Sequence, residues 1–376
     1  MIKAHSVGVG DLLRSSAAWR TLKNKWPEAK LHLLFLTKQQ GYATEDLMKH
    51  HHLLASAHFI AIKSGSPHEL GAKNIALKQV LDAAKTVCTE VKPDLIIDFE
   101  ASGLRTSVVT HTCAKASGAR AVGIASFLGR SFFYDKVAPP VVDYARGHGL
   151  ALPMDYTERD YVALAALGLR REGQAIELQL QPEGVQAKEK LKKHLAEHRK
   201  ENRPTSHVQQ GLHESGLASK ELLMGLNIGC GTPDALHKRP NLDVLADALG
   251  RIHAQTPFTL VLTGAAFERD INQAFIAAYA RQWGDTNHLI DWSGQVSISG
   301  LTGVIDAIDF FISTDSGPYH MAVAQHTPTL VLFTYPEVTS YHDVPWCVRL
   351  VAPYDAADIV TEFRRLQDKH ATANDR

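Results

Sequence analysis

The sequence predicts an α/β protein built from two βα domains. At 376 residues, the chain is long enough to form two hydrophobic cores. Short apolar runs rich in β-forming residues alternate with helical patterns, which is typical of parallel sheets. Residues 202–220 have low hydrophobicity and many turn-forming residues, so they separate two structured parts. We therefore expect a first domain at 1–170, a helix and flexible linker at 171–221, and a second domain at 222–376.

The composition favours a cytoplasmic protein. Hydrophobic residues make up 45% of the chain and charged residues 21%, which is ordinary for a globular protein. The chain has no run of about 18 apolar residues, so no transmembrane helix is expected. Its first residues lack the apolar region of a signal peptide. The four cysteines show no Cys-x-x-Cys spacing, so we expect reduced thiols.

Charge and histidine are unevenly distributed along the chain. The whole chain is neutral, but residues 1–150 contain 19 Lys and Arg against 12 Asp and Glu, a net charge of +7. This excess suggests either an anionic partner for the first half or scattered surface lysines. The only histidine cluster, at residues 50–52, has no acidic or cysteine partner at ligand spacing. We expect it to be a solvated helix end rather than a metal site.

The start of the chain has a β-turn-α-β pattern. Residues 2–7 predict a strand, residues 12 to about 25 a helix, and residues 30–36 a second strand. Asp11 stands where the helix is expected to begin, at the carboxyl end of the first strand. Ligands of open parallel sheets bind at that edge. Asp11 is therefore either a helix N-cap or a carboxylate placed to take a proton from a sugar hydroxyl.

The segment with the most chemical information is Ser-Thr-Asp-Ser-Gly-Pro-Tyr-His at 313–320. It follows an apolar run and precedes a helix-forming segment, so it predicts a strand end, a tight turn and a helix start. Asp315 or Ser316 can cap this helix, and Gly317 can supply a positive φ. Such a helix start is either an anion site that suits a diphosphate or a plain capped helix.

The Asp-Ser-Gly-Pro-x-His order in 313–320 resembles the Asp-Thr-Gly-x-x-His motif of the lipopolysaccharide heptosyltransferases, glycosyltransferase family 9. Ser316 replaces the usual Thr and keeps its hydroxyl. The Gly-Asp pair that ends at Asp11 is similar to a Gly-Asp pair of the family, whose Asp is the proposed general base. The resemblance covers roughly residues 1–125 and 222–335.

Other segments of the second half also resemble donor-binding motifs of the family. The Asn-Pro-Gly and Lys-x-Trp-Pro segments of the family correspond to segments here in which Ile228 replaces Pro and Arg239 replaces Trp. Glu268 matches the family's Gly-x-x-x-Glu spacing. The alternative for Lys238 is an exposed lysine in an ordinary βα loop. The alternative for Glu268 is a first-turn glutamate favoured by the helix dipole. The resemblance implies this donor-binding set: Thr232, Lys238, Glu268, Asp315, Ser316, Gly317 and His320.

The resemblance implies acceptor contacts in the first half at His5, Arg105 and Ser107. His5 stands six residues before Asp11, where the family often carries Lys or Arg. Arg105 and Ser107 follow a buried-strand pattern, near the expected carboxyl edge of the sheet. Arg105 can equally be a cation on a helix surface.

The family implies two Rossmann-like domains that face a cleft, the GT-B glycosyltransferase architecture. It also implies an inverting transfer of heptose from ADP-heptose to an anionic lipopolysaccharide core acceptor, with Asp11 as the base. Lys238 and the helix start at Ser316 would stabilise the leaving ADP. The enzyme would then work in the cytoplasm, with peripheral contact at the cytosolic face of the inner membrane.

The chain has no Asp-x-Asp metal motif, so we expect no essential metal ion. We also expect no cofactor and no nucleic-acid partner. The alternatives are a GT-B transferase with another nucleotide sugar or a non-lipid acceptor, and a nucleotide-sugar-binding protein without catalysis.

Overall fold

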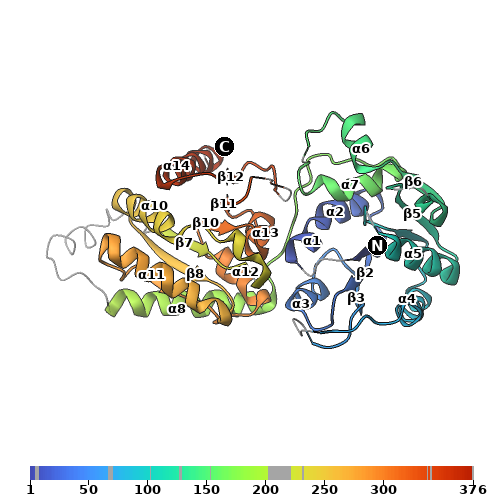
Figure 1. Ribbon diagram of the computed structural model, residues 1–376, viewed down its shortest axis with the longest axis horizontal. Helices are drawn as coiled ribbons and strands as arrows, with labels where there is room; N and C mark the ends of the chain where they lie inside the picture. The colour runs from blue at the N-terminus through green and yellow to red at the C-terminus, as the bar shows by residue number, and fades with distance from the viewer. Residues whose placement is uncertain are drawn as a thin grey trace. The chain divides into compact units, whose positions relative to one another are not determined.

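The computed structural model describes most of the chain as two compact units, Met1–Leu178 and Gln179–Arg376 (Figure 1). The described residues are 1–4, 8–66, 71–101, 103–126, 129–152, 154–201, 222–230, 233–336, 338 and 341–374. The division between the units falls within the segment 171–221 that the sequence assigns to a helix and linker.

The described residues of the first unit form six parallel strands. They are β1 (Ile2–Ala4), β2 (His32–Thr37), β3 (Ser56–Ala61), β4 (Leu95–Ile97), β5 (Arg120–Ile124) and β6 (Lys136–Ala138). They pair as two sheets of order β1-β2-β3 and β4-β5-β6. A parallel bridge between Ile2 and Asp98 joins β1 to the segment after β4. The combined order 3-2-1-4-5-6 is that of a Rossmann fold.

Helices connect these strands. They are α1 (Val9–Leu13), α2 (Ser15–Lys25), α3 (Ala43–Lys49), α4 (Leu77–Val91), α5 (Leu104–Ser117), α6 (Val141–Gly147) and α7 (Glu158–Leu164), with short 3-10 turns at Arg130–Phe133 and Ala165–Leu167. The helices α4 and α5 pack on one another. Their apolar faces share a core with the strands, with Val80 on α4, Val109 on α5 and Leu34 on β2 all buried.

The second unit repeats the same topology. Its strands are β7 (Leu222–Asn227), β8 (Phe258–Thr263), β9 (Leu289–Asp291), β10 (Phe310–Thr314), β11 (Thr329–Phe333) and β12 (Cys347–Val351). They form one parallel sheet of order β12-β11-β10-β7-β8-β9. Counted from β7, this is again the order 3-2-1-4-5-6, so both units are Rossmann-like as predicted.

The described part of the second unit has six helices around this sheet. They are α8 (Pro182–Glu201), α10 (Leu242–Gln255), α11 (Arg269–Trp283), α12 (Ile298–Asp306), α13 (Gly317–Ala324) and α14 (Ala356–Asn374), with 3-10 turns at Pro233–Lys238 and Ala266–Glu268. α10 packs with α11 and α14, while α8 packs against α12. The α8–α12 crossing is close because both helices carry glycine there. A Cβ on Gly303 would overlap the carbonyl oxygen of Gly184.

Three expectations from the sequence need correction. The helix predicted at 12–25 is two helices, α1 and α2, which meet at Arg14. α1 begins at Val9 with Gly8 as its N-cap, so Asp11 lies within the helix and is not its N-cap. His51 is buried, with 1% of its surface exposed, so the cluster at 50–52 is not simply solvated. Its ring contacts Trp19 edge-on at 5.1 Å.

Within the described residues, no helix is long and apolar enough to cross a membrane. The described cysteines form no disulfide with one another; three of them are buried and Cys230 is partly exposed. The described side chains also contain no group of three or more His, Cys, Asp or Glu arranged to hold a metal ion.

Candidate active site

The candidate donor site lies at the carboxyl edge of the second sheet. Strands β8, β7 and β10 are neighbours, and the register pairs Asn227 with both Thr263 and Ser313. Because the strands are parallel, the loops that follow them leave the sheet at one edge. Asn227, Thr263 and Ser313 are all buried there. The described donor-binding residues predicted from the sequence lie in or beside these loops.

The turn between β10 and α13 leaves the start of the helix without a side-chain cap. Ser316 is the N-cap residue, but its hydroxyl donates to Oδ1 of Asn227 at 3.0 Å. Gly317 has helical backbone as the first residue of α13, and Pro318 follows in the first turn. The expected capping by Ser316 is therefore wrong, as is the positive φ at Gly317. Uncapped N–H groups at a helix start attract anions, because the helix dipole adds to them.

Asp315 is the centre of a polar cluster. Its Oδ2 atom lies 2.6 Å from Nζ of Lys238 and accepts a hydrogen bond of 2.5 Å from the hydroxyl of Tyr335. The Asp315 side chain is 5% exposed, whereas Lys238 is 28% exposed. Burial and the neighbouring Asp315 raise the pKa of Tyr335, so its hydroxyl stays protonated and remains a donor. Lys238, predicted as a phosphate contact, is thus already paired with a carboxylate.

His320 links this cluster to a second histidine. Its Nε2 lies 3.8 Å from Oδ1 of Asp315, and its Nδ1 lies 2.8 Å from Nε2 of His342. The backbone N–H of His342 donates to the hydroxyl of Tyr319 at 3.0 Å. Both histidines are buried. This chain of contacts fixes the ring of His320 beside Asp315.

Glu268 lies next to the loop that follows β7. It is 5% exposed, and its Oε2 accepts a hydrogen bond of 2.8 Å from the N–H of Ala265. A Cβ on Gly229 would overlap the Glu268 carboxylate, so this close approach requires glycine. The structure therefore brings together Lys238, Asp315, Ser316, Gly317 and His320 around the start of α13, with Glu268 beside the β7 loop. Thr232 lies outside the described residues.

Asp11 is the candidate base in the first unit. Its side chain is 26% exposed, and its Oδ1 lies 3.3 Å from Nη1 of Arg14. The hydroxyl of Tyr156 donates a short hydrogen bond to the same oxygen. The backbone carbonyl of Asp11 accepts a hydrogen bond of 2.7 Å from Nζ of Lys3. The carboxylate is thus partly open to solvent and held from the protein side.

A buried ionic network supports this arrangement. Asp160 is fully buried, with Nζ of Lys3 at 2.8 Å and Nε of Arg14 at 3.0 Å from its oxygens. Ser15 donates a short hydrogen bond to the same carboxylate. Burial alone would raise the pKa of Asp160, but the cations Arg14 and Lys3 lower it below its ordinary value. Asp160 is therefore ionised and anchors Arg14 beside Asp11.

The predicted acceptor residues lie in different environments. Arg105 is half-buried in the first turn of α5. Ser107, two residues further along α5, is fully buried. Its hydroxyl accepts hydrogen bonds of 2.7 Å from Nε of Arg130 and 2.9 Å from Tyr134. Ser107 is thus enclosed in a polar network, and His5 lies outside the described residues.

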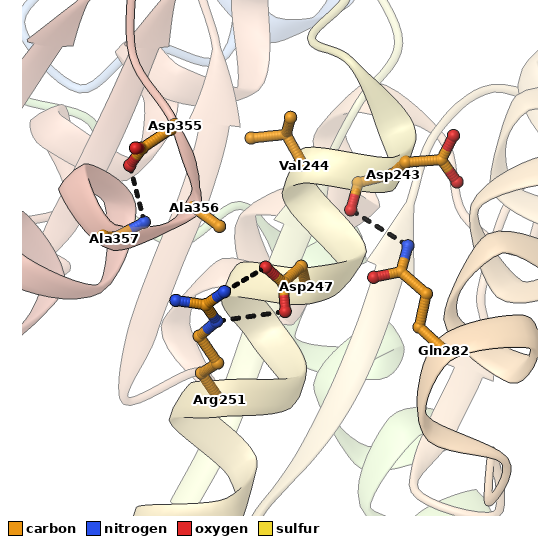
Figure 2. Close-up of a pocket in the computed structure, with 8 residues that line it drawn as sticks. All are labelled: Asp243, Val244, Asp247, Arg251, Gln282, Asp355, Ala356 and Ala357. Carbon is orange, nitrogen blue, oxygen red and sulfur yellow. Dashed lines mark hydrogen bonds and ion pairs between the residues drawn. The ribbon is translucent and has the colours of Figure 1, made fainter.

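A separate groove of about 440 Å³ opens in the second unit (Figure 2). Its lining residues are Asp243, Val244, Asp247, Arg251, Gln282, Asp355, Ala356 and Ala357. Arg251 pairs with Asp247 at 2.6 Å, and the side chain of Gln282 donates to the carbonyl of Asp243 at 3.1 Å. None of the predicted donor residues lines this groove.

A model of a known protein family matches part of the second unit. The family model described as Glycosyltransferase family 9 (heptosyltransferase) matches residues 247–358. This range includes Glu268 and the turn at the start of α13. The comparison with curated proteins gives no significant match.

Several solved structures share the fold. A family 9 glycosyl transferase from Veillonella parvula aligns with TM-score 0.65 and 15% identity, over 97% of this chain and 96% of that chain. The E. coli ADP-heptose LPS heptosyltransferase II gives 0.63 and 15%, over 98% and 99%. The E. coli heptosyltransferase WaaC with ADP gives 0.57 and 14%, over 97% and 99%. At such identities, the likeness establishes the fold.

The two Rossmann-like units share the fold of the GT-B glycosyltransferases, and residues 247–358 match the family 9 model. Within this class, the chain resembles the family 9 heptosyltransferases, as the sequence predicts.

Proposed function

We propose that the chain is an inverting glycosyltransferase that transfers heptose from ADP-heptose to a lipopolysaccharide core acceptor. The supporting observation is the cluster of Lys238, Asp315 and His320 at the uncapped start of α13. A cation and a helix N-terminus together suit the diphosphate of a nucleotide sugar. The solved relatives include an ADP-heptose heptosyltransferase and a heptosyltransferase with ADP, which supports the choice of donor.

In the proposed reaction, an acceptor hydroxyl attacks the anomeric carbon of the sugar. The bond between that carbon and the diphosphate oxygen breaks, and its electron pair leaves with ADP. Asp11 takes the proton of the attacking hydroxyl, as a general base. The new negative charge on ADP is stabilised by Lys238 and by the N–H groups at the start of α13.

The Lys238–Asp315 pair has a consequence for donor binding. The 2.6 Å contact pairs the charge of Lys238 with that of Asp315. A diphosphate must therefore share Lys238 with Asp315 or draw it away. The 28% exposure of the lysine leaves it room to turn toward a ligand, while the hydrogen bond from Tyr335 continues to hold Asp315.

The proposed acceptor is an anionic glycolipid. The net charge of +7 over residues 1–150 favours an anionic glycolipid, met by peripheral contact at the cytosolic face of the inner membrane. Arg105, half-buried at the start of α5, is the described cation that we propose for acceptor contact. No cofactor and no metal ion take part in the proposed reaction, because the protein's own cation and helix dipole face the leaving group.

The direct test is a thermal-shift screen of the full chain with ADP-, UDP- and GDP-sugars. We expect ADP-heptose and ADP to raise the melting temperature, because a ligand that binds only the folded state stabilises it. A larger shift with a UDP- or GDP-sugar would indicate a GT-B transferase with another donor. Binding of ADP-heptose without transfer to any glycolipid would indicate a nucleotide-sugar-binding protein.

A further inference from the structure

The surroundings of Asp11 contain a residue that the sequence motifs do not reveal. Tyr156 precedes α7 and lies 145 residues from Asp11 in the chain, yet its hydroxyl bonds to Oδ1 of Asp11. Tyr156 is 4% exposed. Two guanidinium groups lie over its ring, Arg14 at 4.9 Å and Arg159 at 5.3 Å from the ring centre. The phenol is therefore fixed by packing as well as by its hydrogen bond.

Arg14 holds the same carboxylate oxygen from another side. Its Nη1 lies 3.3 Å from Oδ1 of Asp11, and its Nε bonds to the buried Asp160 at 3.0 Å. Nζ of Lys3 donates to the carboxylate of Asp160 and also to the backbone carbonyl of Asp11. Both the backbone and the side chain of Asp11 are thus tied to one buried network.

We propose that Tyr156, with Arg14, is a positioning residue that orients the Asp11 carboxylate for proton transfer. This inference rests on the proposed function, in which Asp11 is the general base. With two donors on Oδ1, the negative charge on that oxygen is stabilised, and Oδ2 becomes the better proton acceptor. The two contacts fix the plane of the carboxylate, so Oδ2 has a defined direction.

The hydroxyl of Tyr156 acts as a donor throughout. Burial raises its pKa well above the ordinary value, and the negative charge of Asp11 adds to this effect. A phenol that donates to a carboxylate favours the ionised form of the acid. Among the described charged groups of this network are Lys3, Arg14, Glu100, Arg159 and Asp160. These groups remain when the phenol is removed.

The test is Tyr156→Phe, which removes the hydroxyl and keeps the ring between its neighbours. We expect the pKa of Asp11 to rise by about one to two units, because one hydrogen bond to a charged group is lost. The pKa is read from the carboxyl carbon signals of ¹³C-labelled aspartate in the full chain, assigned with Asp11→Asn. The matched control is Tyr144→Phe, whose hydroxyl donates to Glu158 at 3.5 Å in the same unit.

The second measurement is the pH dependence of single-turnover transfer from ADP-heptose to a purified lipopolysaccharide core glycolipid. We expect the acid limb of the profile to move upward by the same amount in Tyr156→Phe and to stay in place in Tyr144→Phe. If the NMR titration of Asp11 does not move, Tyr156 does not act on Asp11 and the inference is overturned. If the titration moves but the acid limb does not, the contact is supported and Asp11 is not the base.

Discussion

Nζ of Lys238 lies 2.6 Å from Oδ2 of Asp315, so the cation proposed to meet the donor also pairs with a carboxylate of the protein. The carboxylate has 5% of its side chain exposed and takes a second hydrogen bond from Tyr335. Donor binding and this ion pair are therefore coupled. Variants of the two residues show whether Lys238 contacts the phosphate directly or only neutralises Asp315.

Lys238→Ala should weaken ADP binding by about 1–3 kcal/mol, the range for a hydrogen bond to a charged group. Asp315→Asn should strengthen binding or leave it unchanged, because it removes the competing charge. The double variant should bind as weakly as Lys238→Ala. Calorimetry on the full chain measures all three.

The matched control for this cycle is Lys188→Ala. Lys188, on α8, is also 28% exposed and pairs with Asp306 of α12 at 2.5 Å. It should leave ADP affinity unchanged. If the double variant regains wild-type affinity, Lys238 serves only to neutralise Asp315 and does not contact the phosphate.

Transfer should persist in excess EDTA. In the proposed site, Lys238 and the N–H groups at the start of α13 supply the positive charge that a divalent ion supplies in other transferases. Single-turnover rates with and without EDTA measure this. Loss of transfer in EDTA and its recovery with Mg²⁺ would contradict the proposed charge balance.

The stability of the first unit should decrease between pH 6.5 and pH 4 because of His51. Burial lowers the pKa of His51 from 6.5 to about 4. Its Nδ1 accepts the N–H of Leu53 at 3.3 Å and its Nε2 lies 3.0 Å from the carbonyl of Glu177, an arrangement that suits the neutral ring. As the pH falls, the unfolded chain binds the proton of His51 before the folded protein does. The contribution of neutral His51 to the free energy of unfolding is therefore complete above pH 6.5 and is lost as the pH falls toward 4.

Within this window, the free energy of unfolding should fall by up to about 1.4 kcal/mol per pH unit because of His51. Urea unfolding at several pH values measures it, and His51→Gln should flatten the dependence. His50→Gln, at an exposed position, is the control and should keep the wild-type slope. An unchanged slope in His51→Gln would show that another group titrates.

Gly303→Ala should destabilise the second unit by about 1–3 kcal/mol or more, because the new Cβ overlaps the Gly184 carbonyl where α8 crosses α12. Gly147→Ala, in α6, is the control. A Cβ there meets nothing within 4 Å, so alanine should be neutral or slightly stabilising. Denaturant unfolding measures both variants, and equal effects would mean that the α8–α12 crossing is not tight.

The sequence predicts the parts of this structure that depend on local pattern. The alternation of strands and helices indicates two Rossmann-like units, and the 313–320 motif points to the turn before α13. Lys238 and Asp315 are both recognisable by resemblance. Their direct pairing is not, because 77 residues separate them and the distance depends on how two loops leave one sheet edge.

Residues without a motif are missed for the same reason. Tyr335 and His342 contact the Asp315 cluster from segments with no recognisable spacing to it, and Tyr156 reaches Asp11 across 145 residues. Ser107 is predicted to lie near the acceptor. The sequence does not reveal that Arg130 and Tyr134 enclose its hydroxyl.

Asp11→Asn provides the most direct test of the central claim, with single-turnover transfer and donor binding measured on the same variant. Gly8 is the N-cap of α1, so asparagine at position 11 removes no cap, and the fold should persist. Asp46→Asn, in the first turn of α3, is the matched control and should keep normal transfer. We predict that Asp11→Asn lowers transfer by about 10²–10⁴-fold, with donor affinity nearly unchanged. Transfer at the wild-type rate with asparagine at position 11 would contradict the assignment of Asp11 as the base.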